Sequence, residues 1–329
     1  MNRLLATAAL SLSATLPAHA QKFCVYDPVG ANGPAYAMAK DYAVAAKSWG
    51  VSALELKAYT DERVAAEDFK AGQCDQVAIT GLRGRQFNSY IGSIDSIGAL
   101  PSYKHLRTVI HALASPASEP SMISGPYEVV GIVPLGAAYV FVRDRSINSI
   151  EKAAGKKIAV LDFDKSQAKL VQQLGAQPVS SDITNFTTKF NNGQVDIVAA
   201  PGIAYKPFEM YKGLGSTGAV YRFPLVQLTG NMLIRRDKFP AGYGQKSRQY
   251  LLTQLDTAEQ TIKKAEADIA EKYWLDLSPA DKAKYTLMMR EARINLTKEG
   301  LYDPKMMAFL KRVRCKIDAG DAECAQNLE

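Results

Sequence analysis

The chain has 329 residues, of which 47% are hydrophobic and 22% are charged. This length suits two ordinary domains, and the composition is globular, which excludes an intrinsically disordered protein. The formal net charge of +7 is mild and spread along the chain, so we expect no nucleic-acid partner.

The first twenty residues are typical of a cleaved signal peptide. Met1–Arg3 supplies a positive start, Leu4–Leu16 is a run of apolar and small residues, and Ala18–Ala20 reads A-x-A. The alternatives are a membrane anchor or a buried helix, but the apolar run is shorter than the about 20 residues that a membrane span needs. Since no later segment has that length and hydrophobicity, we expect residues 1–20 to be removed and the mature protein to be soluble and periplasmic.

The next stretch of the chain predicts a doubly wound α/β unit with a parallel sheet. Residues 22–26, 53–58 and 74–80 have the composition of strands. Helices are expected between them, over residues 35–48 and from Thr60 to Gly72. This alternation of strand and helix is the pattern of an α/β fold.

A second α/β stretch follows a helix expected at residues 103–114. Its predicted strands are 127–133, 138–143, 157–161, 195–199, 220–228 and 231–235. Its predicted helices are 149–154, 165–174 and 184–191. The remainder of the chain is expected to be helical, over residues 244–270, 279–296 and 304–315.

The two halves share an internal repeat that begins F-x-x-G-Q-x-D-x-V-A. Residues 69–87 match residues 190–208 without a gap. The shared Phe is expected to pack on the sheet, the Gly to end a helix, and the Asp to start a strand. We therefore expect two similar lobes with a cleft at the carboxyl ends of their strands, closed by a hinge. The alternative is that any junction of helix, Gly and strand converges on this pattern.

Four cysteines follow the predicted cleavage point, and an exported chain makes disulfides plausible. Cys315 and Cys324 enclose a short polar loop, so we pair them. Cys24 and Cys74 then remain, at or near the start of strands that could be neighbours. The alternatives are metal ligation or free thiols, but no C-x-x-C occurs and no histidine lies near a cysteine, so no metal is expected.

Several segments of the second half resemble the periplasmic solute-binding proteins of TRAP-type transporters. These segments are R-S-I-N-S-I at 145–150, G-K-K-I-A-V at 155–160, G-A-Q-P-V at 175–179 and the repeat at 190–196. The resemblance is closer still to a branch of solute-binding proteins sometimes labelled as efflux-associated. It covers most of the mature chain.

The resemblance implies a two-lobed periplasmic binding protein fold of type II character. We expect lobe 1 at 21–136 and lobe 2 at 137–219, each completed by part of 220–329. A helical C-terminal region at 244–329 is expected to pack on both lobes. The resemblance also implies a monomeric protein that binds a small polar solute, works with a membrane transporter subunit or an efflux component, and needs no cofactor.

One ligand signal of the resembled family is missing from this sequence. Family members place an arginine, which grips the ligand carboxylate in a bidentate way, where this chain has Ala159. A second arginine of some members aligns near Tyr139. An acidic solute therefore does not carry over with the resemblance.

Most candidate ligand-binding residues lie just after predicted strands, and Tyr139 and Ala159 lie within predicted strands. Arg83 and Arg85 could replace the missing anion grip, or lie on a solvated loop. Asp162 and Asp164 could attract an amine, or cap the following helix. The full candidate set is Asp27, Asn32, Thr80, Gly81, Arg83, Tyr139, Ala159, Asp162, Asp164, Pro201 and Tyr205.

Signals for an enzyme are weak. The mature chain has two histidines, His105 and His111, both in one predicted helix, where packing or surface roles are expected. Residues 213–218 match G-x-G-x-x-G but lead into a predicted strand instead of the helix that a dinucleotide site needs. The sequence therefore favours a solute-binding protein over two alternatives, which are an envelope interaction protein that has lost its ligand and an enzyme on the same scaffold.

Overall fold

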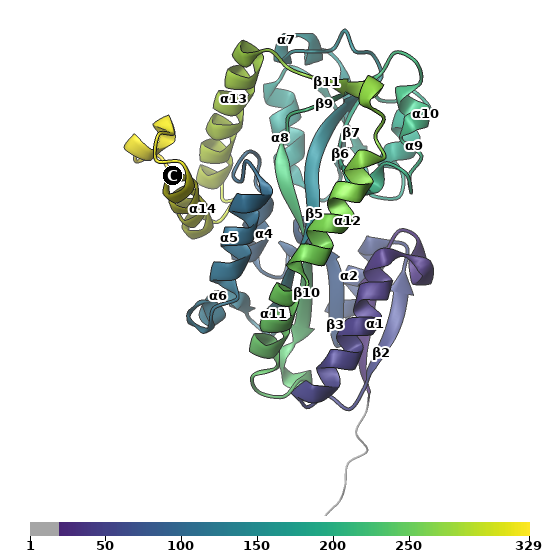
Figure 1. Ribbon diagram of the computed structural model, residues 1–329, viewed down its shortest axis with the longest axis vertical. Helices are drawn as coiled ribbons and strands as arrows, with labels where there is room; N and C mark the ends of the chain where they lie inside the picture. The colour runs from purple at the N-terminus through teal and green to yellow at the C-terminus, as the bar shows by residue number, and fades with distance from the viewer. Residues whose placement is uncertain (1–19) are drawn as a thin grey trace, which may run out of the picture.

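The computed structural model describes residues 20–329, so the predicted signal peptide lies outside the described residues apart from Ala20. Figure 1 shows two lobes stacked along the long axis of the molecule. Strands β5 and β10 pass between the lobes, α12 runs along them, and α13 and α14 lie at one side.

The strands of both lobes form one hydrogen-bonded sheet in the order β2-β1-β3-β10-β5-β8-β6-β7. Pairing is parallel among β2, β1 and β3 at one end of the sheet and among β8, β6 and β7 at the other end. Between these two groups, β10 and β5 are antiparallel to each other and to their outer neighbours. The strands are β1 (Gln21–Tyr26), β2 (Leu54–Tyr59), β3 (Gln76–Thr80), β4 (Ile123–Ser124), β5 (Tyr127–Val142), β6 (Lys157–Leu161), β7 (Gln177–Ser181), β8 (Ile197–Pro201), β9 (Ala219–Tyr221), β10 (Val226–Arg235) and β11 (Trp274–Leu275).

Helices cover the sheet and build the C-terminal region. Those of the first half are α1 (Pro34–Ala46), α2 (Glu62–Lys70), α3 (Gly81–Gly84), α4 (Ser89–Gly92), α5 (Tyr103–Leu113) and α6 (Glu119–Met122). Those of the second half are α7 (Ile150–Ala153), α8 (Lys165–Gln173), α9 (Phe186–Asn191), α10 (Tyr211–Leu214), α11 (Tyr243–Thr253), α12 (Leu255–Ala267), α13 (Pro279–Lys298) and α14 (Pro304–Ile317). The predicted helix 244–270 is thus two helices, which meet at Gln254.

Two strands cross from one lobe to the other, and this corrects the four strands predicted at 127–133, 138–143, 220–228 and 231–235; the start of the third belongs to the separate strand β9. β5 is continuous through Pro134 and Gly136, and β10 is continuous through Thr229 and Gly230. Opposite Leu228 lies Gly136 and opposite Thr229 lies Pro134, so Leu135 is an extra, bulged residue. Gly136 has a φ of 103°, which a residue with a side chain rarely adopts. The bulge lets the ladder continue past a proline that has no N–H to donate.

The repeat segments form the same junction in both lobes. Phe69 and Phe190 are fully buried, and the glycines that follow them have φ values of 78° and 73° at Gly72 and Gly193. These left-handed residues end α2 and α9, as the repeat predicts.

The repeated aspartates then fix the start of each strand. The Asp75 carboxylate accepts a hydrogen bond from the Lys22 N–H at 2.9 Å, and that of Asp196 accepts one from the Lys157 N–H at 2.8 Å. Each aspartate directly precedes a strand and joins it to the start of the parallel neighbour. The internal repeat is a repeat of tertiary contacts as well as of sequence.

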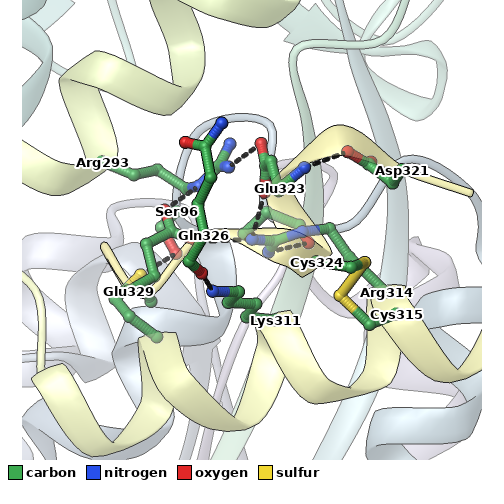
Figure 2. Close-up of polar contacts among 12 residues, drawn as sticks. Ser96, Arg293, Lys311, Arg314, Cys315, Asp321, Glu323, Cys324, Gln326 and Glu329 are labelled. Atoms are coloured by element: carbon green, nitrogen blue, oxygen red, sulfur yellow. Dashed lines mark hydrogen bonds and ion pairs between the residues drawn. A yellow bond between two sulfur atoms is a disulfide. The ribbon is translucent and has the colours of Figure 1, made fainter. Parts of the chain in front are cut away.

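Both predicted disulfides are confirmed. Cys24 pairs with Cys74, and Cys315 pairs with Cys324. The first bond joins β1 to the residues that lead into β3, its neighbour in the sheet. The second closes the loop after α14, and that loop places Glu323 between two buried arginines, Arg293 and Arg314 (Figure 2).

Candidate functional site: the cavity between the lobes

A cavity of about 410 Å³ lies where the two lobes meet the crossing strands. Its volume falls in the range of pockets that hold small organic ligands. Lobe 1 lines it with residues such as Met38 and Leu82, and lobe 2 with Leu161 and Ala199. The crossing strands supply Leu135, Val226 and Leu228, so the bulge of β5 forms part of the wall.

The wall is apolar and its charged groups are all acidic. Among the described residues that line the cavity there is no Lys, Arg or His. The carboxyl groups are those of Asp27, Asp95 and Asp164. Burial raises the pKa of the lining phenols of Tyr26 and Tyr302, so both stay uncharged at neutral pH.

Asp27 follows β1 and holds the loop that leads into α1. Its carboxylate accepts hydrogen bonds from the N–H groups of Val29 at 2.9 Å, Ala35 at 2.8 Å and Tyr36 at 3.1 Å. A side chain at Gly33 would overlap this carboxylate, so the tight approach requires a glycine. The lone pairs of Asp27 are therefore used to fix the start of a helix.

Asp95 lies beside the crossing strand β10 and is almost fully buried. Its carboxyl oxygens accept from the Thr229 N–H at 3.0 Å and the Thr229 hydroxyl at 2.7 Å. Burial raises the pKa of Asp95 to about 7, because the hydrogen bonds from Thr229 compensate for only part of the lost hydration. Gly81 packs so closely on Asp95 and Thr229 that a side chain there would overlap them.

Arg83 is buried and paired within its own lobe. Its Nε donates to a Glu62 carboxylate oxygen at 3.0 Å, and the other Glu62 oxygen accepts from the Thr80 N–H at 2.5 Å. The guanidinium carbon lies 3.7 Å from the centre of the Phe163 ring, which belongs to the other lobe. Burial raises the pKa of Glu62, with the Thr80 and Arg83 contacts opposing that rise.

Arg85 and Asp164 form an ion pair between the lobes. The Arg85 Nη1 lies 3.4 Å from the Asp164 Oδ1, and only 4% of the Asp164 side chain is exposed. Asp164 also accepts from the Ser166 N–H at 3.0 Å, so it caps α8, which was the alternative considered for it. Together with the stacking of Arg83 on Phe163, this pair holds α3 of lobe 1 against the loop before α8 of lobe 2.

The candidate residues from the sequence divide into two groups. Five of them line the cavity: Asp27, Thr80, Ala159, Asp164 and Pro201. Six do not line it: Asn32, Gly81, Arg83, Tyr139, Asp162 and Tyr205. The lining residues at the ends of β1, β3 and β8 follow the rule that open α/β sheets bind ligands at the carboxyl ends of their strands.

The residues outside the cavity have other contacts. Tyr139 alternates with the lining residues Ala138 and Val140, so it faces the other side of β5, where its hydroxyl donates to Glu266 at 3.1 Å. Tyr205 is buried against Phe141. Asn32, at the end of a short 3-10 helix, and Asp162, in the turn after β6, are both exposed.

Residues of the crossing strands form the part of the site that sequence reasoning missed. Leu135 and Leu228 line the cavity from within β5 and β10, and Val226 lines it from the first residue of β10, so none of them follows the carboxyl end of a strand. The motif Pro134-Leu135-Gly136 carried the signal, because a proline and a positive-φ glycine around one leucine indicate a bulge.

Other features of the described residues do not form a second site. Within residues 20–329, no group of three or more His, Cys, Asp or Glu side chains is placed to hold a metal ion. No helix in this part of the chain is both long and apolar enough to cross a membrane. His105 bonds through Nδ1 to the Ser102 hydroxyl at 2.8 Å, and burial lowers the pKa of its imidazole.

Solved structures share this fold over almost their whole length. A TRAP periplasmic solute-binding protein from Desulfovibrio salexigens, with bound orotic acid, has a TM-score of 0.75 and 16% identity, over 91% of this chain and 99% of that one. Another from Haemophilus influenzae, with bound L-gulonate, has a TM-score of 0.75 and 11% identity, over 89% of this chain and 99% of that one. These similarities show the two-lobed fold of TRAP binding proteins.

Sequence comparison gives the family. Residues 43–329 match the family described as Solute-binding protein AdeT 1/2. The probable solute-binding protein AdeT1 of Acinetobacter baumannii is 55% identical over 305 residues, which are 93% of this chain and 100% of that protein. The probable solute-binding protein AdeT2 of the same organism is 30% identical over 234 residues, 71% of this chain and 98% of that protein. The chain therefore belongs to the AdeT 1/2 family of solute-binding proteins.

Proposed function

We propose that this protein captures a small organic solute in the cavity between its lobes, in the periplasm, and presents the closed form to a membrane transporter or an efflux component. The cavity itself carries the proposal, because its walls come from both lobes and from the two strands that join them. A solute in that position contacts both lobes at once and so stabilises their closed arrangement.

The crossing strands supply the hinge for this motion. The bulge at Leu135 interrupts the regular pairing of β5 with β10. Behind it, the Ala137 N–H donates to the Tyr103 hydroxyl at 3.1 Å, and that hydroxyl donates to Glu266 on α12 at 2.8 Å. A few residues around Leu135 and Gly136 can therefore change conformation while each lobe stays intact.

The contacts between Arg83 and Phe163 and between Arg85 and Asp164 form only when the lobes are closed, since each joins one lobe to the other. They close the cavity on the side of α3 and α8. A reaction is not part of the proposal, because the acidic groups in the wall are occupied as a helix cap, a strand contact and an ion pair. The protein acts by binding and release, as a single chain.

The names of the relatives support this proposal. The two relatives from A. baumannii are named probable solute-binding proteins. The solved structures of the same fold contain small organic solutes, such as orotic acid and L-gulonate. The periplasmic location rests on the predicted signal peptide and on the description of those structures as periplasmic proteins.

A thermal-shift screen tests the proposal. A solute at 100 times its Kd adds about 2.7 kcal/mol to the free energy of unfolding. For a protein of this size that is a rise in Tm of about 4 °C. The library contains acids, amines, sugars, peptides and neutral aromatic compounds, and each hit is followed by small-angle X-ray scattering, where a smaller radius of gyration reports closure.

A matched pair of variants assigns each hit to the cavity. Ala199 lines the cavity, and Ala199→Trp fills it. Ala280 is exposed at the start of α13, outside the cavity, so Ala280→Trp is the control. We expect Ala199→Trp to abolish the shift and the control to keep it. If the whole library leaves Tm unchanged, or if Ala199→Trp binds as the control does, the proposal is wrong and an interaction protein without a ligand is favoured.

A further inference from the structure

We infer that the solute of this protein is predominantly apolar and carries no anionic group. The inference rests on the proposed function, because it concerns the same cavity. It separates this protein from the compared structures of the same fold, whose bound molecules include orotic acid, succinate and malonate.

The first observation is the composition of the wall. In the described part of the chain, every charged group that lines the cavity is a carboxyl group, and none is a cation. Position 159, on β6, is an alanine that lines the cavity and is only half-buried. An anionic solute would lose its hydration on entry and meet no positive partner there.

The second observation concerns the nearest cations, which are already paired. Arg83 bonds to Glu62 and stacks on Phe163. Arg85 pairs with Asp164 and donates through Nε to the Gly92 carbonyl at 3.1 Å. The Nη2 of Arg85 is buried without a hydrogen-bond partner, but neither arginine lines the cavity. The charge of each is already balanced by a buried carboxylate of the protein, so neither offers an uncompensated positive charge to a solute.

The third observation is the negative charge of the carboxyl groups that line the cavity. Asp27 and Asp164 line the cavity from opposite lobes; the charge of Asp164 is balanced by Arg85, whereas Asp27 has no ion pair among the described residues, so an anion beside Asp27 would be repelled. Their oxygens accept hydrogen bonds from backbone N–H groups, so those N–H groups are not free to bind an anion either. A neutral or cationic solute avoids this repulsion.

The apolar residues define what fits instead. Leu82, Leu135, Leu161 and Leu228 face the cavity from lobe 1, from lobe 2 and from both crossing strands. All four are only partly buried in this structure, so each has apolar surface left to cover. A solute with an aromatic or branched aliphatic body removes that surface from water when the lobes close.

A matched series of three probes tests the inference. The probes are 3-phenylpropan-1-ol, 3-phenylpropan-1-amine and 3-phenylpropanoate, which share one carbon skeleton and differ in charge. Nile red, a neutral dye whose emission shifts in apolar surroundings, reports occupancy, and each probe is added as a competitor. We expect Nile red to bind at one site and to be lost in Ala199→Trp. We expect the alcohol and the amine to compete at concentrations about tenfold or more below the carboxylate.

Substitutions at Ala159 separate charge from size. Ala159→Arg places a guanidinium in the wall, and Ala159→Met adds similar length without charge. We expect Ala159→Arg to favour the carboxylate over the alcohol, while Ala159→Met keeps the order of the wild type. An unchanged order in Ala159→Arg would show that the missing cation does not set the selectivity.

The inference is overturned if wild-type protein binds the carboxylate as tightly as the alcohol or the amine, or if Nile red does not bind. Failure here is distinguishable from failure of the proposed function. A polar acid that closes the lobes and is lost in Ala199→Trp would leave the proposed function intact and remove only the inference about ligand class.

Discussion

Glu323 bridges two buried arginines, and its replacement by Gln should cost the protein several kcal/mol of stability. Its two carboxylate oxygens lie 2.8 Å from the Arg293 Nη2 and 2.7 Å from the Arg314 Nη2. Both guanidiniums are almost fully buried, and Glu329 is their other carboxylate partner (Figure 2). They also donate to the carbonyls of Ile97 and Ala99, so the network fixes the loop that leads to the cavity wall.

The magnitude follows from the charges. Two guanidiniums and two carboxylates balance in the wild type, whereas Glu323→Gln leaves one buried positive charge uncompensated. Breaking a buried pair in this way costs about 3–5 kcal/mol, and the retained hydrogen bond from the Gln oxygen favours the lower end. With an unfolding entropy of about 2.1 cal/mol/K per residue, a loss of about 3 kcal/mol lowers the Tm of a protein of this size by about 5 °C.

The control is the same substitution at an exposed pair. Glu299 pairs with Lys169 on the surface, where 40% and 44% of the two side chains are exposed, so Glu299→Gln should change Tm by about 1 °C or less. Differential scanning calorimetry at pH 7 measures both variants. If Glu323→Gln lowers Tm no more than Glu299→Gln does, the network does not stabilise the fold.

The pH dependence adds a second readout. Burial acts to raise the pKa of Glu323, but the charges of Arg293 and Arg314 and their hydrogen bonds outweigh it, so the pKa lies below its ordinary value. A carboxyl group with a lowered pKa in the folded state contributes stability above its unfolded pKa, near 4.5, and loses it as the pH falls through the folded pKa. The difference between wild type and Glu323→Gln should therefore be largest at pH 7 and shrink below about pH 4.

Three further predictions concern the lobes and their cores. Asp164→Asn keeps the cap of α8 but leaves Arg85 without its charged partner, so it should enlarge the radius of gyration and weaken solute binding about tenfold. Asp162 is exposed on the same loop, so the control Asp162→Asn should change neither the radius of gyration nor the affinity. Replacing Cys24 and Cys74 together by Ser should cost about 4 kcal/mol, and replacing Cys315 and Cys324 about 3 kcal/mol, because the first bond closes the longer loop; equal costs in urea denaturation would contradict the loop-length argument. Because burial raises the pKa of Asp95 to about 7, unfolding releases a proton between about pH 4 and 7. The free energy of unfolding of the wild type should therefore fall as the pH rises from about 4 to 7, and it should fall less in Asp95→Asn.

The repeat was the most informative sequence feature for the fold. It gave the helix ends at Gly72 and Gly193 and the strand starts at Asp75 and Asp196, because a positive φ and a strand-joining carboxylate each need a particular residue type. The sequence also predicted both disulfides. These are local requirements, and local requirements can be read from a sequence without knowing the partners.

The crossing strands were not predictable in the same way. Pro134 and Gly136 indicate a break in a strand when they are considered alone, and only pairing with β10 shows that the ladder continues through a bulge. Tyr139 was placed near the ligand by alignment, whereas strand alternation turns it toward Glu266. Strand β7, Gln177–Ser181, was missed because its polar residues carry no strand pattern, and its pairing with β6 defines it.

Of the candidate site, the sequence predicted mainly the residues that directly follow strands. Asp27, Thr80 and Pro201 follow strands directly, so their position in the cavity wall follows from topology. The partners of Arg83 and Arg85 could not be predicted, because Glu62, Phe163 and Asp164 meet them through tertiary packing and, for the last two, across the lobes. Those partners balance the charges of both arginines.

A crystal structure of the protein with its tightest-binding solute, identified from the screen, tests the central claim most directly. The account predicts one solute molecule between the lobes, in contact with Leu135 and Leu228 of the crossing strands and with Ala159 of lobe 2, and with the Arg85–Asp164 pair in place. A solute bound elsewhere on the molecule, with the cavity between the lobes unchanged, would contradict it.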